Sequence, residues 1–350
     1  MALTPVKLNL SVNLIGMQNV GRGYFSIALR AAFVLAVFVY LIHEDLLSLE
    51  SLRAAITNWP WMLAGWVCML LTTLVSIARW HFLIRAQGLP MPVRRTFQAA
   101  FIGLFFNVFL PGSMSGDLVK GYYIVRAVPG RIAAAVSSII FDRVVGLSGL
   151  IIIAVLGLFA ASLADWNVTL GPAVILAVIG LGCAVSAFFI ALLAVSEHRD
   201  PFLLILEHRS VPAFLKRLTS VYRGIRSYHN QRFATLAALL ATVVAQSLFV
   251  VGWLCYVRAM AIEGIPLFAL FVMVPIGMLV AAIPIAPAGI GTGHAAFLAI
   301  FAMLGSDRGA DLFNLLLVFQ FAQAAVGGVV YLLARSRPID DALVDRSGSG

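Results

Sequence analysis

Charge is scarce in this chain of 350 residues, of which only 11% are Asp, Glu, Lys or Arg. A soluble domain carries charge on about a quarter of its residues, so the composition excludes an ordinary soluble protein. Hydrophobic residues make up 62% of the chain, and the mean hydropathy is +1.01. Basic residues outnumber acidic ones by 24 to 15. They are spread over the segments between apolar runs, so nucleic acid is not an expected partner, and the composition indicates a polytopic membrane protein.

The chain is equally poor in the residues of metal and redox sites. Its three cysteines, Cys68, Cys183 and Cys255, lie inside apolar runs and far from any CxxC or Cys/His spacing. The sequence also lacks the GxxxxGK(S/T) loop of nucleotide-driven pumps and the GxSxG and HExxH motifs of common hydrolases. We therefore expect no enzyme activity, no catalytic residues, no cofactor and no bound metal. Any directional work would have to come from an ion gradient or from downhill lipid flow.

Long apolar runs dominate the sequence. Six of them reach the roughly 18 to 20 residues that span about 30 Å of hydrocarbon. They are residues 24–42, 59–78, 132–162, 170–195, 233–257 and 312–334. The sequence therefore predicts an all-α polytopic membrane protein with six full transmembrane helices.

Two further apolar stretches, residues 97–117 and 264–304, are interrupted by proline and glycine. Two loops flank the first stretch, residues 79–95 with Arg79, Arg85, Arg94 and Arg95, and residues 112–131 with Lys120, Arg126 and Arg131. Both are basic and belong on the cytoplasmic side, whereas the second stretch begins and ends outside. We therefore predict two opposed re-entrant hairpins, or pairs of half-helices, in an inverted repeat. The strings Ile102-Gly103-Leu104 and Ile276-Gly277-Met278 echo each other, which favours such a repeat.

The predicted organisation is a single integral membrane domain over residues 1–350. Its first half is 1–162, its second half is 233–335, and a disordered tail follows at 336–350. The link at 163–232 contains a basic segment, 197–232, which predicts either amphipathic helices in the headgroup layer or a plain cytoplasmic loop. The charge bias places both termini in the cytoplasm, and we expect the protein in the cytoplasmic (inner) membrane.

Broken helices at membrane depth survive where they line a polar cavity, and the start of a new helix there offers free N–H groups to phosphate. The alternative is that the glycines merely allow close packing. The charged residues Asp142 and Arg143 fall within a long apolar run, where each costs about 2.5 to 3.5 kcal/mol on insertion scales. Neighbours in a helix point about 100° apart, so they are poor partners for each other.

We expect Asp142 to pair with Lys120, Arg126 or Arg131, and Arg143 to pair with Asp117 or a lipid phosphate, although a purely structural ion pair is the alternative. Asp142 and Asp117 are candidate proton carriers. A lone histidine after a glycine turn can simply fill a helix start, and Gln246, Gln320 and Gln323 are expected to form interhelical hydrogen bonds. The full set of candidate substrate-binding residues is Asn107, Pro111, Gly112, Ser113, Ser115, Gly116, Asp117, Lys120, Asp142, Arg143, Pro287, Gly289, Gly291, Thr292 and His294.

Three segments, FNVFLPGSMSGDLVKGYY, AAAVSSIIFDRVVG and PIAPAGIGTGHAAF, resemble the signature regions of the flippase-like transmembrane family named after lysylphosphatidylglycerol synthases. The order and spacing of the segments match. The resemblance implies lipid handling, and the absence of the family's aminoacyl-transfer domain implies a stand-alone member. The family often has an acidic residue where this chain has Thr292, Gly293 and His294.

The expected function is therefore that of a lipid flippase, which moves a phospholipid or isoprenoid-linked headgroup between leaflets through a central polar cavity. An anionic membrane lipid is the expected substrate. Two alternatives remain open: a secondary carrier of a small anionic solute, and a non-transporting membrane partner of a lipid-modifying enzyme. A homo-oligomer or a lipid-synthesis enzyme is a possible partner.

Overall fold

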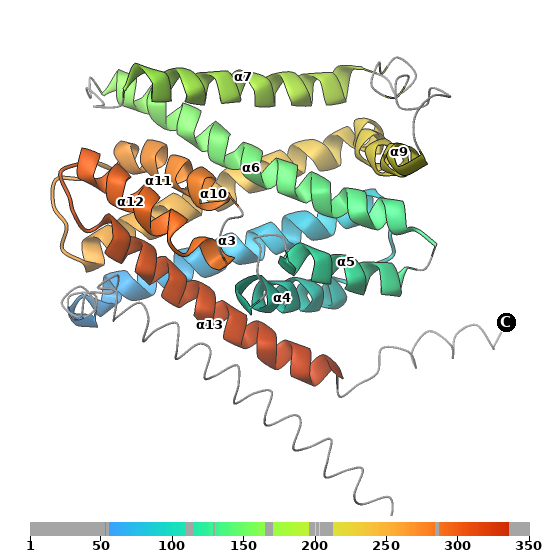
Figure 1. Ribbon diagram of the computed structural model, residues 1–350, viewed down its shortest axis with the longest axis horizontal. Helices are drawn as coiled ribbons and strands as arrows, with labels where there is room; N and C mark the ends of the chain where they lie inside the picture. The colour runs from blue at the N-terminus through green and yellow to red at the C-terminus, as the bar shows by residue number, and fades with distance from the viewer. Residues whose placement is uncertain are drawn as a thin grey trace, which may run out of the picture. The chain divides into compact units, whose positions relative to one another are not determined.

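A computed structural model describes residues 53, 56–109, 115–128, 130–164, 171–195, 200, 203, 213–283 and 287–335. Regular structure in these ranges is entirely helical. Five helices in Figure 1 are long and apolar enough to cross a membrane, judged by length and composition. They are α3 (Trp59–Ala86), α6 (Ile132–Leu163), α7 (Pro172–Ala194), α10 (Arg232–Ala259) and α13 (Gly309–Arg335).

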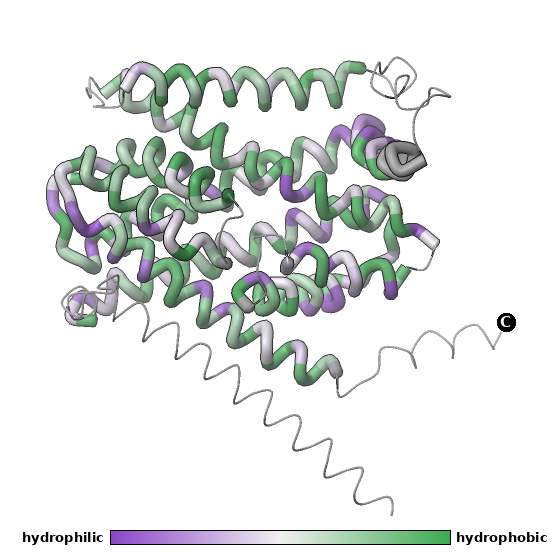
Figure 2. Tube along the Cα trace, viewed as in Figure 1, coloured by the Kyte–Doolittle hydropathy of each residue, from purple (hydrophilic) through white to green (hydrophobic). Residues whose placement is uncertain are grey.

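These helices confirm five of the six predicted runs, and their hydrophobic character continues along most of their length (Figure 2). The sixth predicted run, residues 24–42, and the predicted tail at 336–350 lie outside the described residues. The chain is thus a polytopic helical membrane protein.

Four short helices form two pairs: α4 (Val93–Phe109) with α5 (Ser115–Ala127), and α11 (Leu267–Ala281) with α12 (Thr292–Met303). The longest of them has 17 residues. At about 1.5 Å per residue it reaches roughly 26 Å, which is short of a bilayer core of about 30 Å. Helix α4 ends at Phe109 and α5 begins at Ser115, on either side of the predicted break at Pro111-Gly112. Helix α11 ends at Ala281 and α12 begins at Thr292, on either side of the predicted break at 287–291, whereas Pro275 lies inside α11 without ending it.

The helices of the first pair run in opposite directions. In the first pair Gly103 lies against both Gly116 and Lys120, whereas Asn107, further along α4, lies against Gly116. In the second pair Gly277 of α11 lies against the ring of Phe297 in α12. In both pairs a glycine permits close approach of the two helices, and each pair is called a hairpin below.

The most extensive contact between helices joins α3 and α10, which are also antiparallel. Asn58 donates to the carbonyl of Ala259 at 3.0 Å, and Thr72 donates to that of Ala245 at 3.1 Å. The start of α3 therefore lies beside the end of α10, and the middle of α3 lies beside the middle of α10. Helix α3 also contacts α4 of the first pair, and α10 contacts α11 of the second.

The hairpins occupy corresponding positions against the long helices. Helix α4 packs against α13, and α11 packs against α6. At the first contact Gly327 meets the Phe101 carbonyl, and at the second Gly157 meets the Phe271 carbonyl. A side chain at either glycine would overlap or crowd the neighbouring backbone. The same kind of contact therefore recurs in the two halves of the chain.

The segment 79–95 is not the loop that charge bias predicted. Helix α3 continues to Ala86 and carries Arg79 with it, so that this arginine is buried. The physical reason is local: no glycine or proline occurs between residue 78 and Gly88, and Trp80, Leu83 and Ile84 bury an apolar face beyond residue 78. The arginine ended the apolar run without ending the helix.

The basic segment 197–232 contains α9 (Ala213–Arg226) and the 3₁₀ turn η2 (Ser227–Gln231). Helix α9 packs against α6. Its last residue, Arg226, is buried, donates to the carbonyls of Ala191 and Leu192 at the end of α7, and forms an ion pair with Asp200 at 2.7 Å. This arginine therefore binds a helix C-terminus, where a cation is favoured, and is not part of a lipid-facing charged surface.

Candidate functional site

Asp142 and Arg143, adjacent on α6, contact two different neighbouring helices. Asp142 accepts a hydrogen bond from Nε of Arg79 on α3 at 2.8 Å. Arg143 bonds to the carboxylate of Asp117 on α5. Asp117, one of the two partners expected for Arg143, is confirmed, whereas the partners expected for Asp142 are wrong. They were chosen from the neighbouring loops because Arg79 was itself assigned to a loop.

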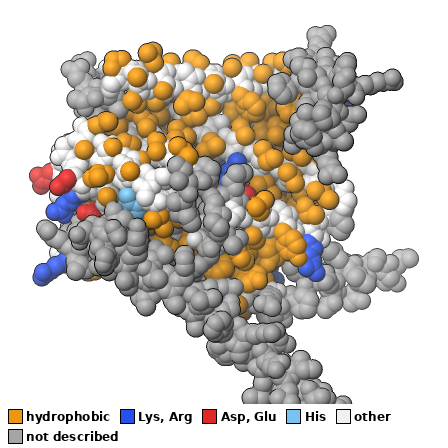
Figure 3. Space-filling view, viewed as in Figure 1, with side chains coloured by type: hydrophobic (Ala, Val, Ile, Leu, Met, Phe, Trp, Pro, Cys, Tyr) orange, Lys and Arg blue, Asp and Glu red, His pale blue; other side chains and the backbone are white. Residues whose placement is uncertain are grey.

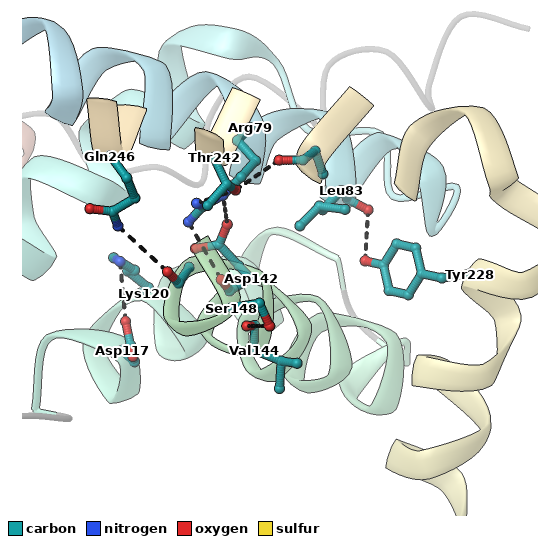
Figure 4. A network of polar contacts seen from close by, with 12 residues as sticks. Arg79, Leu83, Asp117, Lys120, Asp142, Val144, Ser148, Tyr228, Thr242 and Gln246 are labelled. Atoms are coloured by element: carbon teal, nitrogen blue, oxygen red, sulfur yellow. Dashed lines mark hydrogen bonds and ion pairs between the residues drawn. The ribbon is translucent and has the colours of Figure 1, made fainter. Parts of the chain in front are cut away.

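Arg79 joins three helices in the network shown in Figure 4. Besides Asp142 it contacts Thr242 of α10, to whose hydroxyl Nη1 donates at 2.8 Å. A Cβ at Gly146 would lie 3.3 Å from Nη2 of Arg79, so this glycine leaves room for the guanidinium. Asp142 and Gly146 are four residues apart and share one face of α6. The Asp-Arg-x-x-Gly pattern therefore has a packing function on one face and presents Arg143 on another.

A second charged group, the Asp117 cluster, consists of Asp117, Lys120 and Arg143. Lys120 Nζ lies 3.1 Å from Asp117 Oδ1, and the side chain of Asp117 is only 9% exposed. The side chain of Arg143 is 40% exposed. On the described part of the face in Figure 3, hydrophobic side chains are far more numerous than the few basic and acidic ones among them. The cluster thus combines a buried carboxylate with a cation that a ligand from outside the helices could reach.

Close packing fixes the start of α5, where this cluster begins. Ser115 donates to the Phe106 carbonyl at 3.1 Å, and a Cβ at Gly116 would overlap the Gly103 carbonyl. Both Ser115 and Gly116 are buried. The predicted site residues Pro111, Gly112 and Ser113 lie outside the described residues. The described part of the first break therefore shows a packing reason for Gly116.

In the second break, three of the four residues from 288 to 291 have positive φ: Ala288 (53°), Gly289 (73°) and Gly291 (87°). Glycine adopts such conformations without steric cost, whereas alanine does not. Thr292 donates to the Gly289 carbonyl at 3.3 Å. The 3₁₀ turn η3 (Pro287–Gly289) packs against α4. Helix α4 therefore contacts both α5, its partner in the first pair, and the turn η3 in the second break.

His294 is a helix-capping residue in this structure. Its Nδ1 accepts from the Gly291 N–H at 3.2 Å, and its Nε2 lies 2.8 Å from Oδ1 of Asn314. Because Nδ1 accepts a hydrogen bond, we assign the ring proton to Nε2, which donates to Asn314. The ring is 3% exposed and packs against Phe313. Both ring nitrogens thus bond to groups of the protein itself. This agrees with the alternative that His294 fills the start of a helix.

A cavity of about 210 Å³ lies between α3, α4, α10 and α13. Its lining residues are Met69, Thr72, Thr73, Leu104, Asn107, Val108, Phe249, Leu316, Phe319, Gln320 and Gln323. Of these, sequence reasoning had placed only Asn107 in a binding site. Thr72 and Thr73 were missed because a hydroxyl inside an apolar helix can satisfy itself on its own backbone. Only tertiary packing shows that they face Asn107 and the glutamines.

Two glutamines form the interhelical contacts expected of them. Gln323 donates to Thr73 at 2.7 Å, which links α13 to α3, and Gln246 donates to the Gly146 carbonyl at 3.5 Å, which links α10 to α6. Asn107 joins the cavity to the Asp117 cluster, because it lines the cavity and its Cβ lies against Gly116. The candidate site therefore has two adjoining parts, one neutral and polar and the other charged.

The family model of the lysylphosphatidylglycerol synthase TM region matches residues 27–330 of the chain. No curated protein and no solved structure matches the chain. The matched region includes every described residue of the cavity and of the Asp117 cluster.

Proposed function

The chain belongs to the lysylphosphatidylglycerol synthase transmembrane family, and from this premise we propose that it is a lipid translocase and not an enzyme. The headgroup of a phospholipid or isoprenoid-linked lipid would cross through the polar interior, while the apolar tail stays in the bilayer. The observation that carries this proposal is the Asp117 cluster, a charged group between helices whose other surfaces are largely apolar.

The chemistry of the cluster suits a lipid phosphate. Arg143 and Lys120 share one carboxylate, that of Asp117, so that the three side chains carry a net charge of +1. An arginine side chain has five N–H donors and binds phosphate in a bidentate manner. Arg143 is also the most exposed of the three. A phosphate would therefore meet an accessible cation beside the interrupted helix.

The helical hairpins support a transport mechanism. Neither short pair contains a helix that reaches across about 30 Å of hydrocarbon, so we propose that both pairs are re-entrant. Helices α3 and α10 are antiparallel, and the contacts of α4 with α13 recur between α11 and α6. These observations favour an inverted repeat, an architecture in which one half moves against the other around a central site.

The predicted location follows from the same proposal. A lipid translocase with basic segments on one side fits the cytoplasmic membrane, with both termini in the cytoplasm. Oligomers and partner enzymes are not needed for the transport step described here.

Leaflet exchange in reconstituted vesicles tests the proposal. Vesicles that contain the protein should exchange a fluorescent phosphatidylglycerol or polyprenyl phosphate faster than empty vesicles do. Arg143→Gln should slow this exchange by about tenfold or more, because a hydrogen bond to a charged group contributes about 1.5 to 3 kcal/mol. Arg85→Gln is the matched control, since Arg85 is an exposed arginine on α3 outside the cluster.

Equal exchange rates with and without the protein would refute the translocase proposal. Counterflow of a small soluble anion, with no effect on lipid exchange, would instead identify a solute carrier with the same architecture.

A further inference from the structure

Two threonines that line the cavity between α3, α4, α10 and α13 use their hydroxyl hydrogens within the protein. Thr72 donates to the carbonyls of Cys68 and Ala245, at 2.9 and 3.1 Å. Thr73 donates to the Met69 carbonyl at 3.1 Å. A hydroxyl has one hydrogen and two lone pairs. Both threonines therefore present the cavity with oxygen atoms that can accept but have no hydrogen left to donate.

Three carboxamides add further oxygen atoms to the same lining. Gln323 donates from Nε2 to Thr73 at 2.7 Å, and its Oε1 accepts no hydrogen bond from the described residues. Gln320 makes no side-chain hydrogen bond to the described part of the chain. The buried Oδ1 of Asn107 also has no partner there, and such an atom usually indicates a missing water or ligand. Among the described lining residues, five side chains thus offer oxygen atoms, whereas free amide N–H groups come only from Asn107 and Gln320.

This excess of oxygen atoms favours a cation. An anion would meet the lone pairs of the lining, whereas a cation is coordinated by them. None of the described lining residues is charged, and Ca²⁺ and Mg²⁺ sites are built with carboxylates. The cost of removing an ion from water rises steeply with its charge, so uncharged oxygens replace the hydration of a monovalent ion more completely than that of a divalent one. The chemistry thus suits an alkali-metal cation such as Na⁺ or K⁺.

The end of α4 adds to this preference. Asn107 and Val108 line the cavity and belong to the last turn of α4, which ends at Phe109. The C-terminal end of a helix carries partial negative charge and carbonyls without intrahelical partners. In transporters with interrupted helices, such ends coordinate the coupling cation. By contrast, no described residue of α5, whose start has the opposite polarity, lines the cavity.

The cavity has room for an ion and part of its hydration shell. Its volume is about 210 Å³, and one water takes about 30 Å³ in the liquid. The ion would therefore be held by side-chain oxygens from α3, α4 and α13 together with several waters.

We propose that this cavity binds an alkali-metal cation through the oxygens of Thr72, Thr73, Asn107, Gln320 and Gln323. The ligands lie on three helices and form no sequence motif, so local pattern gives no sign of the site. Binding of the ion does not depend on the translocase proposal, whereas a role as the coupling ion for lipid movement rests on it. An ion gradient would then supply the directional work of transport.

Thermal unfolding of the detergent-purified full chain tests the proposal without a transport step. The midpoint Tm is measured in NaCl, KCl, MgCl₂ and choline chloride at the same ionic strength. NaCl or KCl should raise Tm by about 2 °C or more above the value in choline chloride, because an ion that binds only the folded state stabilises it. Radioactive Na⁺, or Rb⁺ as a tracer for K⁺, measures the affinity directly. Gln320→Leu and Thr73→Val should each weaken this affinity by about tenfold or more, since each removes an oxygen ligand of a charged group.

The matched controls are Gln246→Leu, which removes a carboxamide outside the cavity lining, and Thr235→Val, which removes a buried hydroxyl of α10 outside it. Both should keep the affinity for the ion. If Thr73→Val does not fold, because Thr73 joins α3 to α13, Gln320→Leu still tests the site. Equal midpoints in all four chlorides would overturn the proposal and leave water as the occupant of the cavity. A shift that is largest in MgCl₂, or one that persists in both cavity variants, would also overturn it.

Lipid exchange separates this proposal from the translocase proposal. Ion binding that depends on Thr73 and Gln320, in vesicles that show no lipid exchange, overturns only the transport proposal. Lipid exchange by a protein that binds neither Na⁺ nor K⁺ overturns only the cation site. Exchange that is insensitive to Na⁺ and K⁺ gradients, in a protein that binds the ion, overturns only its role as the coupling ion.

Discussion

The pair formed by Arg79 and Asp142 should contribute strongly to stability, and a double-mutant cycle can measure its contribution. The perturbations are Arg79→Met, Asp142→Leu and the two together. Arg79 Nε lies 2.8 Å from Asp142 Oδ1, and the side chains are 7% and 16% exposed. Screening by water is therefore limited, and the removal of one charge leaves the other buried among α3, α6 and α10.

The magnitude follows from these distances. Two unit charges 2.8 Å apart attract each other by about 6 kcal/mol at an effective dielectric of about 20. Desolvation offsets much of this attraction, and loss of one partner of a buried pair typically costs about 3 to 5 kcal/mol. Replacement of both partners by apolar residues should cost much less, because no buried charge remains. The coupling energy should be about 3 kcal/mol.

The assay is the free energy of unfolding in mixed detergent micelles, with the thermal midpoint Tm as a second measurement. Arg85→Met, on the exposed side of α3, is the control for loss of an arginine from this helix. Arg79→Lys should be intermediate, because an ammonium on a flexible chain does not reproduce the fixed fork that contacts both Asp142 and Thr242. Strictly additive single changes would refute the reasoning, since they would show that the two residues are not coupled.

Three further predictions concern close packing and helix capping. Gly149→Ala should destabilise the protein by about 1 to 3 kcal/mol, because its Cβ would overlap the Thr242 methyl group. Unfolding measurements should show partial recovery in combination with Thr242→Ser, which removes the methyl but keeps the hydroxyl for Arg79. Gly116→Ala should destabilise the α4–α5 hairpin by a similar amount, whereas Gly121→Ala on the same helix should change the unfolding free energy little, since its Cβ would lie 3.5 Å from Ile139. His294→Ala should lower stability by about 1 to 2 kcal/mol through loss of its cap, and it should leave the affinity for phosphatidylglycerol unchanged in binding measurements.

Each of these predictions has a result that contradicts it. No recovery in the Gly149 and Thr242 double variant would show that the methyl group is not the source of the overlap. Equal effects of alanine at residues 116 and 121 would show that the close contact of Gly116 with Gly103 does not contribute to the stability of the hairpin. A loss of phosphatidylglycerol binding in a folded His294→Ala variant would assign this histidine to the ligand site, contrary to its capping geometry.

The sequence by itself determined the class of fold. Continuous apolar runs predicted the five long helices of the described chain, because each run must satisfy its own backbone hydrogen bonds in hydrocarbon. Proline and glycine located the interruptions of the two short pairs to within a few residues, and the three signature segments indicated the family. The contact of Arg143 with Asp117 was also predictable, since a charge in an apolar helix requires a partner.

Only the tertiary structure decided which residues meet across helices. Arg79 was assigned to a loop because its charge interrupted the apolar run, although the helix continues past it to bury Trp80 and Leu83. The sequence could not bring Thr73, Asn107 and Gln320 to one cavity, because each lies on a different helix and helix rotation is set by packing. The close approaches at Gly116 and Gly149 likewise depend on other helices, α4 and α10. The local sequence shows that these residues are small, but it does not show which neighbour requires a small residue there.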